Sequence, residues 1–172
     1  MTNVDVVIIG AGPCGLSAAT HLKSTGMDVR VFGKPMDFWA TKMPAGMLLR
    51  SPRIASTISD PSDSHRLEVF ENKLSAPRVG RSSLATFVEY GKWFQRELIS
   101  DLDTRDVVSV ERFNGGFRTV LQDGSSVDSN RVVVASGIGP FQRVPQLLQN
   151  FSLQQVSHCY SGTDIQSFPG KK

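Results

Sequence analysis

The sequence predicts an α/β domain in which a parallel β-sheet is flanked by helices and accompanied by a β-meander. Three observations lead to this fold class. "VDVVIIG" (residues 4–10) precedes a glycine-rich turn and a helical segment, short alternating strands after residue 106 are separated by Asn-Gly-Gly and Asp-Gly turns, and "VVV" at 132–134 ends in small residues. Continuous apolar runs are typical of buried parallel strands, whereas those turns are typical of antiparallel hairpins.

The composition is that of an ordinary globular protein and excludes several function classes. The 172 residues suffice for one domain, and the 40% apolar and 20% charged residues lie near globular averages. The net charge is only +3, without the dense basic stripe of a nucleic-acid-binding protein. No apolar stretch reaches the ~20 residues that span a bilayer, and the first ten residues resemble a strand more than a signal peptide. We therefore expect a cytoplasmic protein without nucleic-acid or membrane partners.

The two cysteines, Cys14 and Cys159, lie far apart in the sequence, and no C-x-x-C pair exists. This spacing excludes a zinc ribbon and a redox-active dithiol. No metal site is expected.

The first 32 residues predict a βαβ unit. Residues 4–10 form a strand buried on both faces, and residues 13–26 form a helix that starts at Pro13 and stops at Gly26. Residues 28–32 form the second strand. A unit of about 30 residues in this order is the context that makes a glycine-rich loop a credible nucleotide-binding motif.

The middle of the chain is predicted to be irregular and then helical. Residues 35–80 are rich in Pro, Ser and Met and predict a loop with at most a short helix. Residues 82–99 regain helical spacing, with Ser82 as the expected N-cap. The expected apolar side consists of Leu84, Phe87, Val88, Trp93, Phe94 and Leu98.

The last third predicts a meander that leads into a buried strand. "VVSVERF", "GFRTVLQDG" and "SSVDSNR" are short strands separated by turns, and "RVVVASG" (131–137) reads as a further, fully buried strand.

Residues 10–15 carry the motif G-x-G-x-x-G between the first strand and the first helix. Gly10 permits the tight turn, Gly12 lets the backbone approach a pyrophosphate, and Gly15 lets the helix pack closely on the strand. The helix N-terminus supplies free N–H groups and the positive end of its dipole. The motif therefore predicts a Rossmann-like dinucleotide site, with contacts from Gly10, Ala11, Gly12, Pro13, Cys14 and Gly15.

The end of the second strand departs from this motif. An Asp or Glu is expected there to bind the adenosine ribose, but the chain has Gly33 followed by Lys34. A missing acid beside a cation admits a 2′-phosphate, so an NADP-binding Rossmann module is an alternative. A non-catalytic nucleotide-binding or interaction module is another.

Two further stretches carry a family resemblance. "VVVASGIG" (132–139) resembles the "ATG"-type strand of flavoproteins with two dinucleotide domains, which returns beneath the first glycine loop. "KPMDFWATKMPAGMLLRSP" (34–52) resembles the segment after the second strand in N-hydroxylating and Baeyer–Villiger monooxygenases, and "FVEYGKWF" (87–94) resembles a helix of flavin-containing monooxygenases. Met36, Met43 and Met47 could serve the core or the flavin equally well.

The chain thus resembles the N-terminal FAD-binding portion of a class B-like flavoprotein monooxygenase or related NAD(P)H-dependent oxidoreductase. The resemblance implies an FAD/NAD(P)-binding Rossmann-like fold over residues 1–172. It also implies that NADPH reduces FAD and that oxygen from O₂ reaches an amine, sulfur or ketone. The further cofactor contacts that it implies are Phe32, Gly33, Lys34, Pro35, Trp39, Arg50, Val108, Ala135, Ser136 and Gly137. No residue is assigned a catalytic role.

"HCYSGTDIQSFPGKK" (158–172) resembles the stretch before a second glycine loop that opens an NADPH domain, and no second G-x-G-x-x-G occurs in the 172 residues. We therefore expect a partial, truncated FAD-binding domain, with NADPH bound only where the other domain is supplied. Such a chain is expected not to turn over alone, and its exposed interdomain face favours self-association or a partner chain. The adenosine ribose is then held by backbone groups near Gly33 or by Asp37, so that a Gly33→Glu variant should bind FAD at least as tightly.

Overall fold

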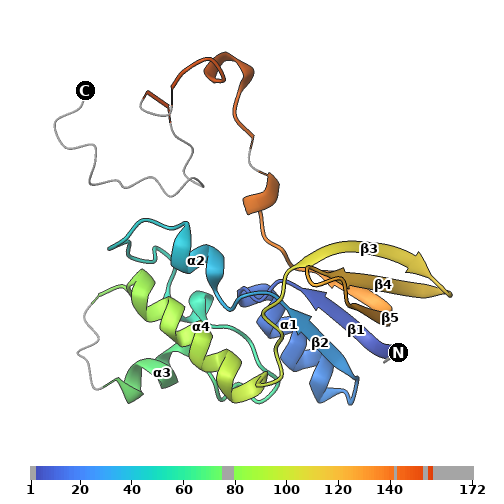
Figure 1. Ribbon diagram of the computed structural model, residues 1–172. Coiled ribbons are helices and arrows are strands. Elements are labelled where there is room, and N and C mark those ends of the chain that lie inside the picture. Colours follow the sequence, from blue (N-terminus) through green and yellow to red (C-terminus); the bar gives the residue numbers. More distant parts are fainter. Residues whose placement is uncertain (1–2, 75–79, 142, 153–154, 157–172) are drawn as a thin grey trace.

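The computed structural model describes residues 3–74, 80–141, 143–152 and 155–156 (Figure 1). Its helices and strands follow the order β1 (Asn3–Ile9), α1 (Pro13–Ser24), β2 (Val29–Phe32), α2 (Asp37–Thr41), η1 (Arg53–Ser56), α3 (Leu67–Lys73), α4 (Leu84–Leu98), β3 (Val107–Phe113), β4 (Gly116–Leu121), β5 (Ser126–Val134), η2 (Gly139–Phe141) and η3 (Gln146–Leu148). The 158–172 stretch and Cys159 lie outside the described residues.

The sheet has the strand order β2-β1-β5-β4-β3. β1 pairs in parallel with β2 and with β5, whereas β3, β4 and β5 pair antiparallel in succession. The predicted α/β fold, a parallel sheet with helices and a meander, is therefore confirmed.

β5 joins the two parts of the sheet. Its first residues pair antiparallel with β4 (Val120 with Ser126), and its later residues pair in parallel with β1 (Ile9 with Val134). The two strands predicted for residues 125–137 are thus one. The prediction of a fully buried strand was wrong, because Val134 is 70% exposed.

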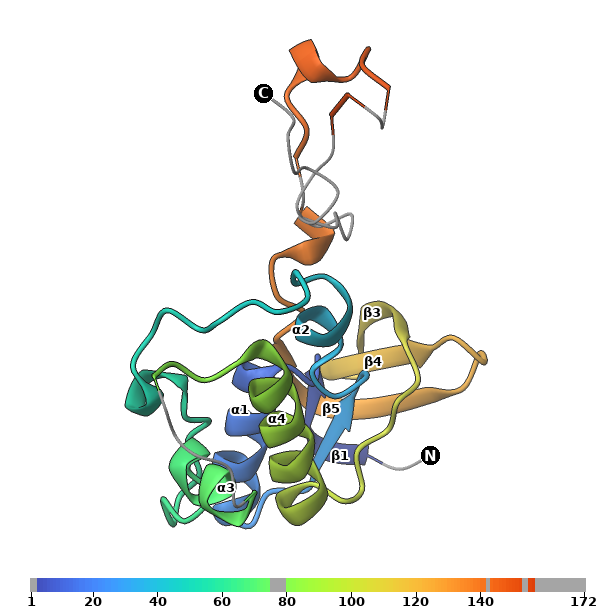
Figure 2. The same ribbon diagram turned by 90° about the vertical axis from the view of Figure 1, so that its left-hand side faces the viewer.

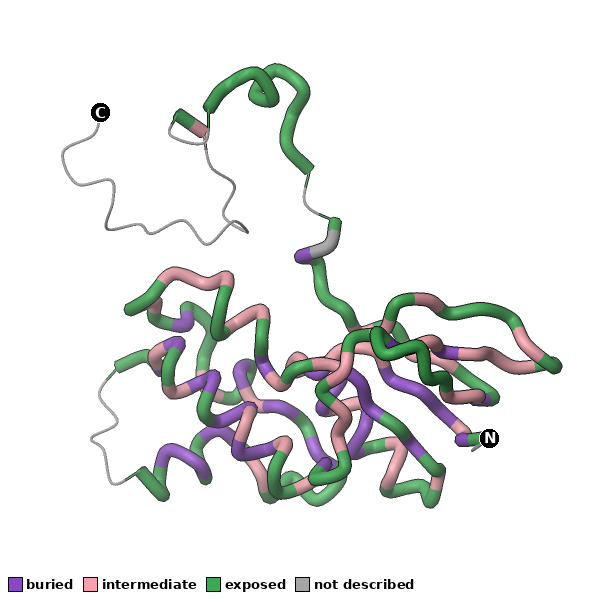
Figure 3. The backbone as a smooth tube through the Cα atoms, in the orientation of Figure 1, coloured by how far each residue is buried: buried purple, intermediate pink, exposed green. Residues whose placement is uncertain are grey.

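Helices and meander lie on opposite sides of the parallel strands. Figure 2 shows α1 and α4 to the left of β1 and β2, and β3, β4 and β5 extending to the right. On the helix side, buried residues of β1 and β2 pack against α1, α3 and α4. On the other side, Leu121 of the meander packs with Val7 and Phe32 in a second, smaller cluster. Two apolar layers therefore hold the parallel strands in place. Figure 3 shows buried residues along β1 and along the helices that cover it.

The start of α4 differs from the prediction by one residue. The N-cap is Ser83, whose Oγ accepts a hydrogen bond from the Thr86 N–H at 3.0 Å. Ser82 is instead buried and donates its hydroxyl to Glu71, which also accepts from Arg53 Nε at 2.7 Å. Ser82 and Ser83 have the same propensity for the N-cap position. Tertiary contacts decide between them, because Ser82 binds Glu71 and Ser83 caps α4.

The segment predicted to be irregular contains more helix than expected, namely α2, α3 and η1. Tyr90 of α4 anchors its loops, since its hydroxyl accepts from the Ile58 N–H at 2.9 Å and donates to the His65 carbonyl at 2.8 Å. Burial raises the pKa of Tyr90 to about 12, because the ionised form would lose its hydration.

After β5 the described chain leaves the body of the domain (Figure 1). Residues 143–152 are exposed throughout, including Leu147 and Phe151. Within the described part of the chain, no helix has the length and apolarity to cross a membrane, and no three potential metal-ligating His, Cys, Asp or Glu side chains cluster.

Candidate dinucleotide-binding site

The carboxyl ends of β1, β2 and β5 meet at one edge of the sheet. The Gly10 N–H donates to the Phe32 carbonyl at 2.8 Å, and the Ala135 N–H donates to the Ile9 carbonyl at 2.7 Å. Residues that are more than 100 positions apart in the sequence are thereby brought together. In open α/β sheets this edge is where ligands bind.

Two of the three motif glycines are required by the packing of the protein itself. A Cβ on Gly10 would lie 2.3 Å from the Ala135 carbonyl oxygen, and a Cβ on Gly15 would lie 1.9 Å from the Gly10 oxygen. Real Cβ atoms do not approach backbone so closely. The end of β5, followed by Ala135, therefore lies directly beneath the glycine loop, as the sequence predicts.

Gly12 is different, because its Cβ position is open. A Cβ there would meet nothing within 4 Å, and its φ of −78° and ψ of −178° suit any residue. Gly12 is also the N-cap of α1, and the cap has no side-chain hydrogen bond. The first turn contains no acidic residue, and Pro13 carries no N–H. An uncapped 12-residue helix with an open Cβ position at its N-cap suits an anion such as a pyrophosphate.

Gly33 lies directly beside this loop. Its φ is +128°, and a Cβ on it would lie 3.3 Å from the Ala11 nitrogen. Such a φ is unfavourable for every residue with a side chain. A glutamate at this position would therefore be strained, because the backbone conformation of Gly33 favours glycine. Lys34, which follows, is exposed.

Several predicted contacts can act only through backbone atoms. The Phe32 and Ala11 side chains are 1% and 3% exposed within the core, so only their main-chain groups reach the sheet edge. The exposed residues among the predicted contacts near that edge are Cys14, Lys34, Ser136 and Gly137.

Three predicted contacts lie outside the glycine loop and the parallel strands. Trp39, on α2, packs edge-to-face on Phe87 with ring centroids 4.9 Å apart. Val108, on β3, is 69% exposed. Arg50 is exposed and forms no hydrogen bond or ion pair within the described part of the chain. Their cofactor roles stay predictions.

Met36 belongs to the core. It is 1% exposed, its φ is 59°, and its N–H donates to the Ala11 carbonyl at 3.0 Å. A Cβ on Gly91 of α4 would lie 2.4 Å from the Met36 sulfur. Met36 therefore fixes the turn after β2 between the glycine loop and α4. Met43 and Met47 are half-buried and pack on the same core.

Sequence reasoning missed a second neighbour of Gly33. The Gly33 N–H donates to the Asp103 carbonyl at 2.9 Å, and the Asp103 N–H donates to the Val31 carbonyl at 2.9 Å. Hydrogen bonds from Arg105 hold the pKa of the Asp103 carboxyl below its usual range. The polar stretch "DLDTRD" has no periodicity, so only its position before a predicted strand could have drawn attention to it.

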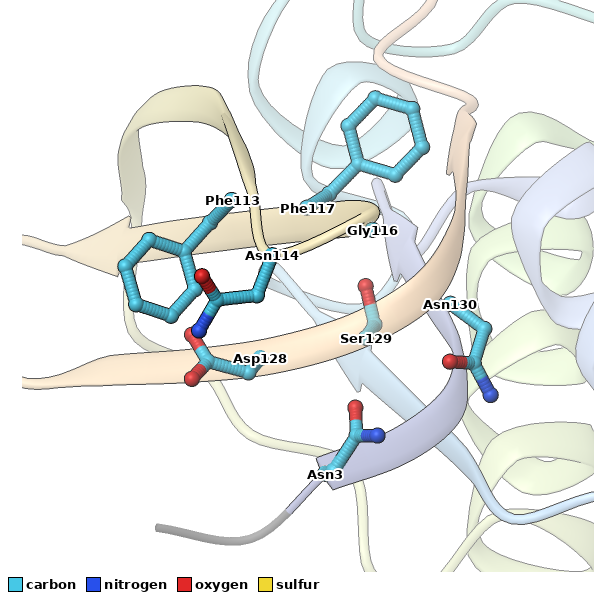
Figure 4. Close-up of a pocket in the computed structure, with 8 residues that line it drawn as sticks. All are labelled: Asn3, Phe113, Asn114, Gly116, Phe117, Asp128, Ser129 and Asn130. Atoms are coloured by element: carbon cyan, nitrogen blue, oxygen red, sulfur yellow. The ribbon is translucent and has the colours of Figure 1, made fainter.

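A cavity of about 230 Å³ lies at the amino end of β1, which is the opposite end from the glycine loop (Figure 4). Its lining includes Asn3, Asn114, Asp128 and Ser129. The buried Ser129 hydroxyl has no hydrogen-bond partner within the described residues. This cavity is separate from the edge where the three strand ends meet.

Comparisons with known proteins agree with this geometry. Residues 4–167 match the family model described as pyridine nucleotide-disulphide oxidoreductase. Thiamine thiazole synthase from Pyrobaculum arsenaticum is 44% identical over 50 residues, which are 29% of this chain and 19% of that protein. Bacilliredoxin reductase Bdr from Bacillus subtilis is 56% identical over 34 residues, which are 20% of this chain and 10% of that protein.

A solved flavin-containing monooxygenase from Stenotrophomonas maltophilia shares the fold. Its TM-score is 0.71 at 23% identity, and the match covers 85% of this chain and 42% of that chain. The matched region therefore covers less than half the length of each of these three proteins.

Proposed function

Because the chain belongs to the pyridine nucleotide-disulphide oxidoreductase family, we propose that it is an FAD-binding domain of a flavoprotein oxidoreductase. The observation that carries this proposal is the open position at Gly12. It lies in front of the uncapped N-terminus of α1, at the edge where β1, β2 and β5 end. We propose that this FAD-binding domain comprises residues 1–172.

The residues at this edge suit an extended dinucleotide. N–H groups in the first turn of α1 would bind the pyrophosphate, which Gly12 leaves room to approach. Backbone groups of residues 33–35 would hold the adenosine ribose, and Trp39 and Arg50 would contact the flavin half. Bound FAD would supply the oxidation–reduction chemistry, while the protein orients it and limits its contact with water.

A monooxygenase-type reaction with NADPH as reductant is part of the proposal. It is supported by the fold shared with a flavin-containing monooxygenase. The 172 residues contain one G-x-G-x-x-G motif, so we propose that NADPH needs a second nucleotide site. This sequence alone should then bind FAD without sustained NADPH oxidation.

We also propose that the domain associates with another domain or with a second chain. Ile138, Phe141 and Leu147 are 79%, 76% and 87% exposed, and exposed apolar groups in one segment support an interaction surface. The free, exposed thiol of Cys14 is compatible with a reducing cytoplasmic location, which we propose as well.

One observation favours a second candidate, an NADP-binding module. Gly33 has no side chain to repel a 2′-phosphate, and the exposed Lys34 follows it. Titration with NADP⁺ and with FAD separates the two candidates, because only an NADP-binding module should bind NADP⁺ more tightly than FAD.

Substitution of the motif glycines tests the proposed site. Gly12→Ala should lower thermal stability only slightly, because its Cβ enters open space and alanine is merely a poorer N-cap than glycine. It should weaken FAD binding at least about tenfold, or ~1.4 kcal/mol. Gly15→Ala is the contrasting variant, since its Cβ meets the Gly10 oxygen and should destabilise the apoprotein. Undiminished FAD affinity in Gly12→Ala would place the cofactor elsewhere.

A further inference from the structure

Arg105 connects two elements that lie far apart in the sequence. Its Nε donates to both Asp103 carboxylate oxygens at 3.0 Å, and its Nη2 donates to Asp103 Oδ2 at 2.5 Å. Its Nη1 donates to Asp123 Oδ2 at 2.6 Å and to Ser125 Oγ at 3.0 Å. Asp123 and Ser125 belong to the turn between β4 and β5. One guanidinium thus ties the segment before β3 to that turn.

The segment that Arg105 holds is next to the proposed adenosine end of the site. Asp103 forms a parallel bridge with Phe32, and its carbonyl accepts the Gly33 N–H. Gly33 in turn lies against Ala11 of the glycine loop. Glycine loop, Gly33 and Asp103 therefore follow one another along the sheet edge, and the 103–106 segment lies outside Gly33.

A backbone contact adds to the same attachment. The Gln122 N–H donates to the Asp106 carbonyl at 2.9 Å. The meander is thus fastened to the 103–106 segment by main chain and by Arg105. Because two carboxylates already neutralise the guanidinium, Arg105 is better suited to orient this segment than to bind a phosphate itself.

We propose that Arg105 is a positioning residue for the adenosine half of FAD. It fixes the 103–106 segment against Gly33, so that main-chain groups at the end of β2 can hold the ribose without an acidic side chain at position 33. This inference rests on the proposed function.

Arg118 provides a matched control in the same meander. Its Nε and Nη2 donate to Asp128 at 2.8 and 2.9 Å, so it also makes a two-pronged contact with a carboxylate. Asp128 pairs in register with Asn3 at the start of β1, whereas Gly33 follows the end of β2. The two arginine pairs therefore lie toward opposite ends of the parallel strands.

The test compares Arg105→Gln, Arg105→Lys and Arg118→Gln by calorimetric titration of the apoproteins with FAD and with ADP, which contains only the adenosine and pyrophosphate half. Arg105→Gln should weaken both ligands by the same factor, about tenfold, equivalent to ~1.4 kcal/mol. Arg105→Lys should lose less, because an ammonium still reaches one carboxylate. Arg118→Gln should stay within about twofold for both ligands, a change of less than ~0.5 kcal/mol.

Thermal unfolding of the apoproteins shows whether a variant loses ligand affinity only because its fold is destabilised. If Arg105→Gln does not fold, Arg105→Lys is compared with the unsubstituted protein instead. Weaker FAD binding with unchanged ADP binding would overturn the inference, as would equal losses in Arg105→Gln and Arg118→Gln. If the unsubstituted protein binds neither FAD nor ADP, the proposed function fails and this inference fails with it. If it binds both and Arg105→Gln binds them equally well, only this inference fails.

Discussion

Gly33 occupies the position where the glycine-loop motif calls for a carboxylate. In the structure its φ of +128° explains why a glycine is present, and a Cβ there would lie only 3.3 Å from the Ala11 nitrogen. Met36, three residues later, is also in the left-handed region and is buried against the same loop. The turn after β2 is therefore shaped by its backbone, and the missing acid is one consequence of that shape.

Gly33→Ala and Gly33→Glu should both lower the free energy of unfolding, by about 1–3 kcal/mol, because a residue with a side chain is strained in this region. Urea denaturation of the apoproteins measures the change. Alanine has no carboxylate, so similar losses in the two variants would locate the effect in the backbone. A Gly33→Glu protein as stable as its parent would contradict this account, because it would show that the backbone at position 33 accepts a side chain.

At the scale of elements, the meander depends on charged contacts as well as on its small apolar cluster. Arg105 bridges Asp103 and Asp123, and Arg118 pairs with Asp128 across β4 and β5. Hydrogen bonds lower the pKa of all three carboxyl groups. Arg105 donates to Asp103, and Arg118 donates to Asp128. Asp123 accepts first from Ser125 and then from Arg105. The meander should therefore lose stability as acid protonates these carboxyl groups.

The sign of this effect follows from linkage. A carboxyl group whose pKa is lower in the folded state stabilises the fold above its unfolded pKa of about 3.9, and this contribution is lost as the pH falls through the folded value. Amide hydrogen exchange should show the meander opening before α4 as the pH falls below about 4.

Asp128→Asn should make the free energy of unfolding depend less on pH in this range. Opening of α4 first would contradict the account. The losses should be modest, since these pairs are largely exposed.

Across the whole molecule, the sequence predicted best what local pattern determines. The apolar run before Gly10, the glycine spacing and the Pro13 helix start are local signals, and the βαβ unit follows from them. Assignment of the N-cap to Ser82 failed, because burial against Glu71 decided between two adjacent serines. The exposure of Val134 and the bridge from Asp103 to β2 depend on which strands pair. Such long-range pairing leaves little trace in a single sequence.

The central claim is that the edge formed by the ends of β1, β2 and β5 binds FAD. Its most direct test is titration of the purified apoprotein with FAD and, separately, with NADP⁺, followed by calorimetry and by the absorbance of the flavin that stays with the protein after desalting. The account predicts one FAD bound per chain and clear preference over NADP⁺. A colourless protein that binds NADP⁺ more tightly than FAD, or that binds neither nucleotide, would contradict it.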